Sequence, residues 1–296
     1  MGHEADVRVS LADDRRLLEC GMPADRTAIM KRAFGADRAL IGMLHLGALP
    51  GTPAARAPLG DVITRALGEA HAYAQAGFTA LMIENMHDRP FLKRAVGPEI
   101  VAAMTAVSVE VRRASGLPLG VQALAGANRE SLAVAFACGA TFVRVEGYVF
   151  AHVADEGLIE ADAGELLRYR RVIGAEGVAV FADVKKKHAA HAITGDMDVV
   201  DTALAAEFSL ADGVILSGDA TGREADPEEV THVSGAVSIP VLVGSGLTPD
   251  NLAMFAAADG FIVGSSVKRG GLWSNELDPA AVAAMAKAFR SLGPRA

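Results

Sequence analysis

The stretch PVLVGSGLTPDNLAMFAAADGFIVGSSVKRGG, from Pro240 to Gly271, contains the triplet Val-Gly-Ser twice. The two copies stand at 243–245 and 263–265, and each one ends a short apolar run. Between them lies a segment of helical composition that opens with Thr248-Pro249, a capping residue followed by a first-turn proline. The stretch therefore predicts two parallel strands, one helix apart, that end in the same kind of turn.

The same alternation of apolar runs and helical segments extends over most of the chain. Apolar runs of about four to seven residues have the length of strands, and several are apolar throughout, as parallel strands covered on both faces are. The eight runs lie at 39–44, 80–84, 119–123, 142–146, 178–184, 212–217, 241–245 and 260–265.

Eight strands alternating with eight helices predict an α/β fold of the (β/α)₈ TIM barrel type. The alternative is a doubly wound open sheet, which usually carries a G-x-G-x-x-G turn after its first strand. Here the first strand is followed by HLGALPGTP, which does not fit that pattern. We expect residues 1–38 to form an N-terminal helix and loop extension, under the barrel or at an oligomer contact, and residues 39–296 to form a single barrel domain.

Composition excludes several classes of protein. The chain of 296 residues has a formal net charge of −8, which argues against a general nucleic-acid binder and against binding to an anionic membrane. Its apolar runs are too short for a transmembrane segment, and its acidic first residues do not resemble a secretory signal. Two cysteines argue against a disulfide framework. These features predict a cytoplasmic protein, and they leave self-association into a homo-oligomer open.

Polar residues gather where the predicted strands end, which is where barrel enzymes carry their catalytic groups. Glu84 is the clearest case, because a carboxylate that ends an apolar strand must be paired or solvated. The predicted catalytic residues are Glu84, Asp183, Lys185, His45 and His188, and further residues of the mouth are Asn85, Asp88, Gln122, Arg144, Glu146 and Lys187.

Several of these residues have more than one interpretation. Arg144 and Glu146 share a face of their strand, so they either line the mouth or form a structural ion pair. Asp183 and Lys185 also share a face, and the lysine could act in acid/base chemistry, as a Schiff-base amine or as a phosphate clamp. The run of three lysines before His188 either binds an anion, which we favour, or is a solvated loop.

The two Gly-Ser turns predict a phosphate site. Many barrels hold a phosphate with the loops after strands seven and eight, where glycines allow close approach of backbone N–H groups and serines add donors. Lys268 and Arg269 follow the second turn closely. The alternative is two tight turns without a ligand. The predicted phosphate-binding residues are Gly218, Thr221, Gly222, Gly244, Ser245, Gly246, Gly264, Ser265 and Ser266.

The sequence gives only a weak indication of metal binding. His45, Glu84, Asp183 and His188 are suitable ligand types, but no H-x-D or H-E-x-x-H spacing is present. We therefore predict no cofactor and keep a divalent metal as a weakly supported alternative.

The motifs IGMLHLGALPGTP, VGPEIVAAMTAV, ADVKKKHA, SGDATG and VGSGLTPDN…ADGFIVGSSVK resemble the BtpA family, also called the BtpA/SgcQ family. The resemblance runs from about Leu40 to Phe289. It implies a TIM barrel similar to the ribulose-phosphate-binding barrels, with a phosphate-binding end. The family is named for a protein of photosystem I biogenesis, and the resemblance implies no particular reaction. Two positions depart from the family pattern, because Gln122 and Glu146 stand where it commonly has asparagine.

The leading hypothesis is an enzyme that acts on a phosphosugar or a phosphoribosyl compound by acid/base isomerase or lyase chemistry. Glu84 or Asp183 would serve as the base, and Lys185 or His188 as the acid or as a stabiliser of an enediolate. One alternative is a phosphate-ligand-binding regulatory or assembly factor without enzymatic activity. Another is a metal-dependent hydrolase.

Overall fold

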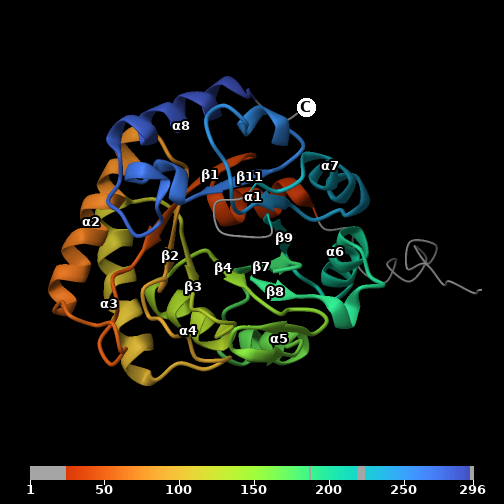
Figure 1. The fold of residues 1–296 in the computed structure, drawn as a ribbon, viewed down its shortest axis with the longest axis horizontal. Coiled ribbons are helices and arrows are strands. Elements are labelled where there is room, and N and C mark those ends of the chain that lie inside the picture. Colours follow the sequence, from red (N-terminus) through yellow and green to blue (C-terminus); the bar gives the residue numbers. More distant parts are fainter. Residues whose placement is uncertain (1–24, 187, 219–223, 294–296) are drawn as a thin grey trace, which may run out of the picture.

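The computed structural model describes residues 25–186, 188–218 and 224–293. Eight parallel strands close into a barrel, which confirms the predicted fold. Within the described residues, seven α-helices surround the barrel in a ring (Figure 1). In order around the barrel, the strands are β1 (Ala39–His45), β2 (Ala80–Glu84), β3 (Leu119–Gln122), β4 (Phe142–Val145), β7 (Ala179–Val184), β9 (Gly213–Leu216), β10 (Val241–Val243) and β11 (Gly260–Val263).

Several helices of the ring begin or end at capping residues. Asp226 and Asp278 cap their helices by accepting hydrogen bonds from first-turn N–H groups, and a proline follows each of them. Gly77 and Gly139 adopt the left-handed conformation after theirs. The helices are α2 (Leu59–Ala76), α3 (Pro98–Ser115), α4 (Asn128–Cys138), α5 (Ala163–Val172), α6 (Val199–Phe208), α7 (Pro227–Ala236) and α8 (Pro279–Ser291).

The prediction of an α-helix between β10 and β11 is wrong. A short 3₁₀ helix, η4 (Leu252–Phe255), stands in its place. The Thr248 N–H donates to Asn251 Oδ1 at 2.8 Å, and the Asn251 N–H donates to Thr248 Oγ1 at 3.3 Å. These side-chain bonds to the backbone hold a turn at the site where Thr248-Pro249 predicted the start of an α-helix.

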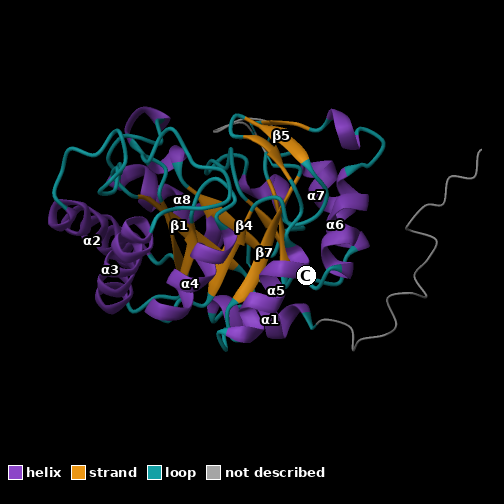
Figure 2. Cartoon of the chain, turned by 90° about the horizontal axis from the view of Figure 1, so that it is seen from below, coloured by secondary structure: helices purple, strands orange, loops and turns teal. Residues whose placement is uncertain are grey.

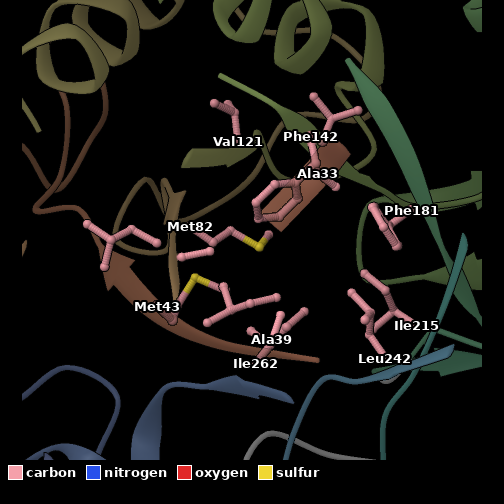
Figure 3. Packing of buried hydrophobic residues seen from close by; sticks show 14 of the residues in the cluster. Ala33, Ala39, Met43, Met82, Val121, Phe142, Phe181, Ile215, Leu242 and Ile262 are labelled. Atoms are coloured by element: carbon pink, nitrogen blue, oxygen red, sulfur yellow. The ribbon is translucent and has the colours of Figure 1, made fainter. Parts of the chain in front are cut away.

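Side chains fill the barrel interior (Figure 3). Met43, Met82, Phe142 and Phe181 reach inward from four different strands and are buried. The ring of Phe142 lies over Gly120 of β3, where a Cβ atom would come within 2.2 Å of the ring. The glycine therefore makes room for a large aromatic side chain, and the barrel is a packed core rather than a pore.

Helix α1 (Arg26–Phe34) packs across the N-terminal end of the barrel (Figure 2). The ring centroid of Phe34 lies 4.8 Å from that of Phe142 and 5.3 Å from that of Phe181. The hydroxyl of Thr141, just before β4, donates to the carbonyl of Ala33 at 2.7 Å. The leading helix thus covers the end of the barrel opposite the predicted site.

A small second sheet lies at the other end of the barrel from α1 (Figure 2). A hairpin in the loop after β4 provides β5 (His152–Ala154) and β6 (Gly157–Ile159), and the loop after β7 provides β8 (Ala189–Ala190). The strand order is β6-β5-β8, and both pairings are antiparallel. Two loops over the mouth are therefore joined by backbone hydrogen bonds.

None of the described helices is long and apolar enough to cross a membrane.

Candidate active site

A cavity of about 340 Å³ opens where the C-terminal ends of the barrel strands meet. One part of its wall is made of backbone and small side chains from Gly244–Thr248 and Gly264–Ser266. The ionisable side chains that line it are Glu84, Glu146, Asp155, Glu156, His45, His188, Arg144 and Lys186. The cavity therefore combines the two Gly-Ser turns with a group of acids and bases.

The sheet register sets three polar residues side by side at this end of the barrel. His45 is paired with Glu84, and Glu84 is paired with Gln122, on three adjacent strands. His45 Nε2 lies 3.8 Å from Glu84 Oε2, and the two side chains are 8 % and 11 % exposed. The prediction that His45 and Glu84 share the mouth is thus met by their placement, while their chemical roles stay predictions.

Glu146 is held by two neighbours in the cavity wall. Gln122 Nε2 donates to Glu146 Oε1 at 3.2 Å, and Lys186 Nζ lies 2.9 Å from Glu146 Oε2. Lys186 also lies 4.0 Å from Glu156 Oε2. Burial raises the pKa of Glu146, with Lys186 acting against that shift. Gln122 and Glu146, which end β3 and follow β4, are therefore direct hydrogen-bond partners.

Arg144 forms its ion pair with Asp183 rather than with Glu146. Its Nε and Nη2 atoms each donate to a different carboxylate oxygen of Asp183 at 2.9 Å, and both side chains are almost fully buried. Burial lowers the pKa of the Arg144 guanidinium, but Asp183, together with Glu84 and Glu146, outweighs that effect, so the pKa is raised. The alternative of an Arg144–Glu146 pair is wrong, because Arg144 reaches the neighbouring strand β7 instead. Asp183 is occupied by this pair and does not line the main cavity.

Among the described lysines, the one that lines the main cavity is Lys186, which sequence reasoning missed. Lys185, the predicted catalytic lysine, donates from Nζ to the carbonyl of Met197 and lines a smaller neighbouring cavity. Lys185 has a backbone φ of 46°, which is not a strand conformation. The alternation of side chains along β7, which would have placed Lys185 on the same face as Asp183, therefore ends before Lys185. The sequence carries no signal for that break. Lys187 lies outside the described residues.

Asn85 and Asp88 brace the loops around the mouth and do not line the cavity. Asp88 accepts from the Leu49 N–H at 2.8 Å and from Asn85 Nδ2 at 2.9 Å. Asn85 Oδ1 accepts from the Leu124 N–H at 2.8 Å. Burial raises the pKa of Asp88, and these hydrogen bonds act against the shift. The two predicted mouth residues thus tie together the loops after β1, β2 and β3.

The two Gly-Ser turns face the cavity from adjacent strands, as predicted. The short helix η5 (Ser265–Val267) begins at the second turn, and Val267 and Lys268 donate their N–H groups to the carbonyls of Gly264 and Ser265. The N–H groups of Ser265 and Ser266 come before these two in the helix, and the first N–H groups of a helix have no carbonyl partner within it. A Cβ atom on Gly264 would lie 3.1 Å from Cε1 of His45. The second turn therefore touches the acid/base part of the site.

The first turn is braced by the loop after β9. Ser245 Oγ accepts a hydrogen bond from the Gly218 N–H at 3.1 Å, so Gly218 supports the turn and does not itself line the cavity. Thr221 and Gly222, the other predicted phosphate-binding residues of that loop, lie outside the described residues.

The side chain of Lys268 pairs with a residue of α2 and does not line the cavity beside the Gly-Ser turns. Its Nζ lies 2.7 Å from Glu69 Oε2 of α2, and its side chain is 1 % exposed. Burial lowers the pKa of Lys268, while Glu69 acts in the opposite direction. The lysine therefore ties the last loop to α2, and the expectation of a nearby cation for the anion site is wrong at this position.

Two acidic residues of the site were also missed by sequence reasoning. Asp155 and Glu156 form the turn of the β5–β6 hairpin and line the cavity. Their strands have only three residues each, which is too short for a clear alternation of apolar and polar positions.

No metal centre is formed by the residues that the structure describes, since no group of three or more His, Cys, Asp or Glu side chains among them could hold a metal ion. We therefore assign no metal ligands, and the acid/base interpretation of the cavity does not depend on a metal.

Comparison with known proteins gives the family. Residues 36–291 match the BtpA family. The chain belongs to the BtpA family. It is 42 % identical over 270 residues to an uncharacterized mitochondrial protein of Caenorhabditis elegans, covering 89 % of this chain and 98 % of that one. It is 39 % identical over 262 residues to the photosystem I biogenesis protein BtpA of Synechocystis, covering 87 % and 90 %. Since the worm protein is named as mitochondrial, a cytoplasmic location for this BtpA-family chain stays a prediction.

Solved structures of low sequence identity share the fold of this family member. Thiamine phosphate pyrophosphorylase of Pyrococcus furiosus aligns with a TM-score of 0.55 at 15 % identity, over 88 % of this chain and 98 % of that one. Orotidine 5′-phosphate decarboxylase of Pyrococcus horikoshii aligns with a TM-score of 0.53 at 14 % identity, over 84 % and 99 %. These likenesses establish the TIM barrel.

Proposed function

We propose that this BtpA-family protein is an enzyme that binds a phosphorylated small molecule, a phosphosugar or a phosphoribosyl compound, in the barrel mouth. The observation that carries the proposal is that one cavity is lined both by the two Gly-Ser turns and by Glu84, Glu146 and Lys186. Backbone N–H groups at Ser265 and Ser266 suit a phosphate, which would anchor the ligand. Binding energy from the phosphate would then position the rest of the molecule over the acids and bases.

The reaction that suits these groups is proton transfer next to a carbonyl, as in isomerases and lyases. The Glu84 carboxylate would take a proton from the carbon beside the carbonyl. The electron pair of that C–H bond would form a C=C bond, and the π pair of the C=O bond would move onto the carbonyl oxygen. Lys186 would stabilise the resulting enediolate by its charge. In an isomerase the proton then returns to the neighbouring carbon. His45, in contact with Glu84, would orient the carboxylate.

Names of structural neighbours are compatible with this proposal. Thiamine phosphate pyrophosphorylase, phosphoribosyl anthranilate isomerase and orotidine 5′-phosphate decarboxylase each name a phosphorylated compound. Because their identity to this chain is low, the support for a phosphate site rests mainly on the two Gly-Ser turns of this chain.

The phosphate site is tested by titration of inorganic phosphate, followed by ³¹P NMR. We expect saturable binding to the wild type and its loss in Ser266→Asp, which places a negative charge at the start of η5. Ser274→Asp makes the same change at an exposed position and should bind phosphate normally. Absence of phosphate binding to the wild type would contradict the proposal.

The chemistry is tested by solvent exchange. Phosphosugars and phosphoribosyl compounds that bind are incubated with the protein in D₂O, and ¹H NMR follows the loss of the proton beside the carbonyl. Glu84→Gln should abolish exchange and leave phosphate binding intact. Exchange at the wild-type rate in Glu84→Gln would remove Glu84 from the role of base.

A second candidate function is a ligand-binding assembly or regulatory factor. It is favoured by the name of the Synechocystis relative, a photosystem I biogenesis protein. The two candidates differ in one outcome, because a binding factor would be stabilised by its ligand and show neither exchange nor turnover.

A further inference from the structure

We infer that the ligand carries a protonated amine on the part that lies away from its phosphate. The inference rests on the proposed function and narrows it to phosphorylated amines, such as amino sugar phosphates. Two independent observations support it: the balance of charges in the cavity wall and a buried acceptor that has no donor.

The cavity wall has more negative than positive charge among the described residues. Its carboxylates are Glu84, Glu146, Asp155 and Glu156, and its permanently charged cations are Arg144 and Lys186. Both cations are already matched, because Arg144 is held by Asp183 and Lys186 lies between Glu146 and Glu156. His45, which lies 3.8 Å from Glu84, and His188 also line the cavity and carry a charge only when protonated. The surplus is counted without Glu84, because among the described residues Lys186 faces three carboxylates, Glu146, Asp155 and Glu156. A phosphate dianion entering this cavity would thus meet surplus negative charge.

Gln122 provides the second observation. Its side chain lines the cavity, the residue is 2 % exposed, and its amide nitrogen donates to Glu146. Within the described part of the chain, its amide oxygen is buried and accepts no hydrogen bond. The reverse orientation of the amide would set that oxygen against the Glu146 carboxylate, so the donor to Glu146 fixes the assignment. A buried acceptor of this kind calls for an N–H or O–H group on the ligand.

An amine suits both observations better than a hydroxyl does. A hydroxyl would donate one hydrogen bond but would leave the surplus carboxylates uncompensated. An ammonium group donates three hydrogen bonds and also supplies the missing positive charge. A metal ion bridging the carboxylates would be the other source of charge, but the described residues form no cluster of three or more metal ligands.

The inference is tested with a matched pair of ligands on the full chain. Isothermal titration compares glucosamine 6-phosphate with glucose 6-phosphate, which differ by an amine in place of a hydroxyl, and inorganic phosphate reports the phosphate site alone. We expect glucosamine 6-phosphate to bind about tenfold more tightly than glucose 6-phosphate, because its ammonium group compensates the charge of the carboxylates. The preference should shrink as salt is added.

Charge variants of the hairpin connect this preference to the cavity. The double variant Asp155→Asn, Glu156→Gln should lose most of the amine preference while it binds inorganic phosphate at least as tightly as the wild type. Glu160→Gln removes one charge from an exposed position just beyond the hairpin and should keep the preference.

The possible outcomes separate the two proposals. If both sugar phosphates and inorganic phosphate bind and the amine gives no advantage, the amine is wrong and the phosphate site stands. If the amine preference survives in the hairpin variant unchanged, the carboxylates of the hairpin are not its source and the inference is overturned. If none of the three ligands binds, the proposed function itself fails, and the amine fails with it.

Discussion

Arg144 and Asp183 form a two-point ion pair across neighbouring strands, with Nε and Nη2 of the guanidinium each 2.9 Å from a carboxylate oxygen. The pair lies beneath the cavity, and only the arginine lines it. A carboxylate with both oxygens bonded to a buried guanidinium is held in one orientation, because turning it toward a ligand would leave that guanidinium uncompensated. We therefore propose that Asp183 positions Arg144, and that the proposed acid/base role belongs to residues that face the cavity.

Removing one partner of this pair should be costly. We expect Asp183→Asn to lower the free energy of unfolding by about 3–5 kcal/mol, since it leaves Arg144 buried without its counter-charge. Urea denaturation measures the change. Glu176→Gln removes the partner of Arg171 from an exposed ion pair at 2.8 Å and should cost less than about 1 kcal/mol. Equal small losses in the two variants would show that the buried pair contributes little.

Gly264→Ala should disturb the site more than the fold. The added methyl group would lie 3.1 Å from His45 Cε1, so the imidazole must move away from its place beside Glu84. We expect phosphate affinity and any proton exchange to fall about tenfold or more, with a loss of stability of about 1–3 kcal/mol. Gly68→Ala, in α2 with no atom near the new methyl group, should leave binding unchanged and stabilise the helix slightly. Normal binding by Gly264→Ala would place His45 outside the site.

Lys186 and Glu146 should be energetically coupled, whereas Lys185 and Glu146 should not be. In a double-mutant cycle of Lys186→Met and Glu146→Gln, the interaction free energy should be about 1–3 kcal/mol, because either single change leaves a buried charge unmatched. The cycle of Lys185→Met with Glu146→Gln should be additive within about 0.5 kcal/mol, because Lys185 contacts the Met197 carbonyl. Urea denaturation of the wild type and the five variants tests both statements, and equal coupling in the two cycles would contradict the assignment of Lys186.

Stability should fall in mild acid partly because of His152. Burial, followed by the positive charge of Lys186, lowers the pKa of His152 from 6.5 to about 4. Between these two pH values the unfolded chain binds a proton at this residue that the folded chain does not, so the folded state loses stability as the pH falls. The loss attributable to His152 is up to about 3 kcal/mol between pH 7 and pH 4.

The His152→Asn variant isolates this contribution. Unfolding free energies of the wild type and the variant should run parallel above pH 7 and diverge below pH 6.5, with the wild type losing more. Parallel curves down to pH 4 would show that His152 titrates in the folded protein much as it does in the unfolded chain.

Much of the fold could be predicted from the sequence. The apolar runs of a parallel barrel are long enough to recognise, and helix-capping residues mark the segments between them. The run 80–84 coincides with β2, and 39–44 misses only His45 at the end of β1. The helix expected after Thr248 could not be judged in this way, because the choice between a turn and a helix depends on the mutual hydrogen bonds of Thr248 and Asn251.

The candidate site could be predicted only where the strand pattern fixes a side chain. His45, Glu84 and Gln122 fall at strand ends, and the register brings them together. Lys186 could not be chosen over Lys185, because the change in backbone direction at Lys185 has no sequence signature. Asp155 and Glu156 reach the cavity only because a short hairpin folds over the mouth, and a contact between distant loops leaves no periodic trace in either one.

The small β6-β5-β8 sheet carries Asp155 and Glu156 on its hairpin, and Lys186 stands in the loop that leads into its third strand. The Gly-Ser turns follow β10 and β11, whereas this sheet is built from the loops after β4 and β7. Under the two proposals, the segments that bind the phosphate and the segments that select the rest of the ligand are therefore separate in the chain. We expect an exchange of residues 146–162 and 185–190 as a unit between relatives to change specificity on an unchanged barrel.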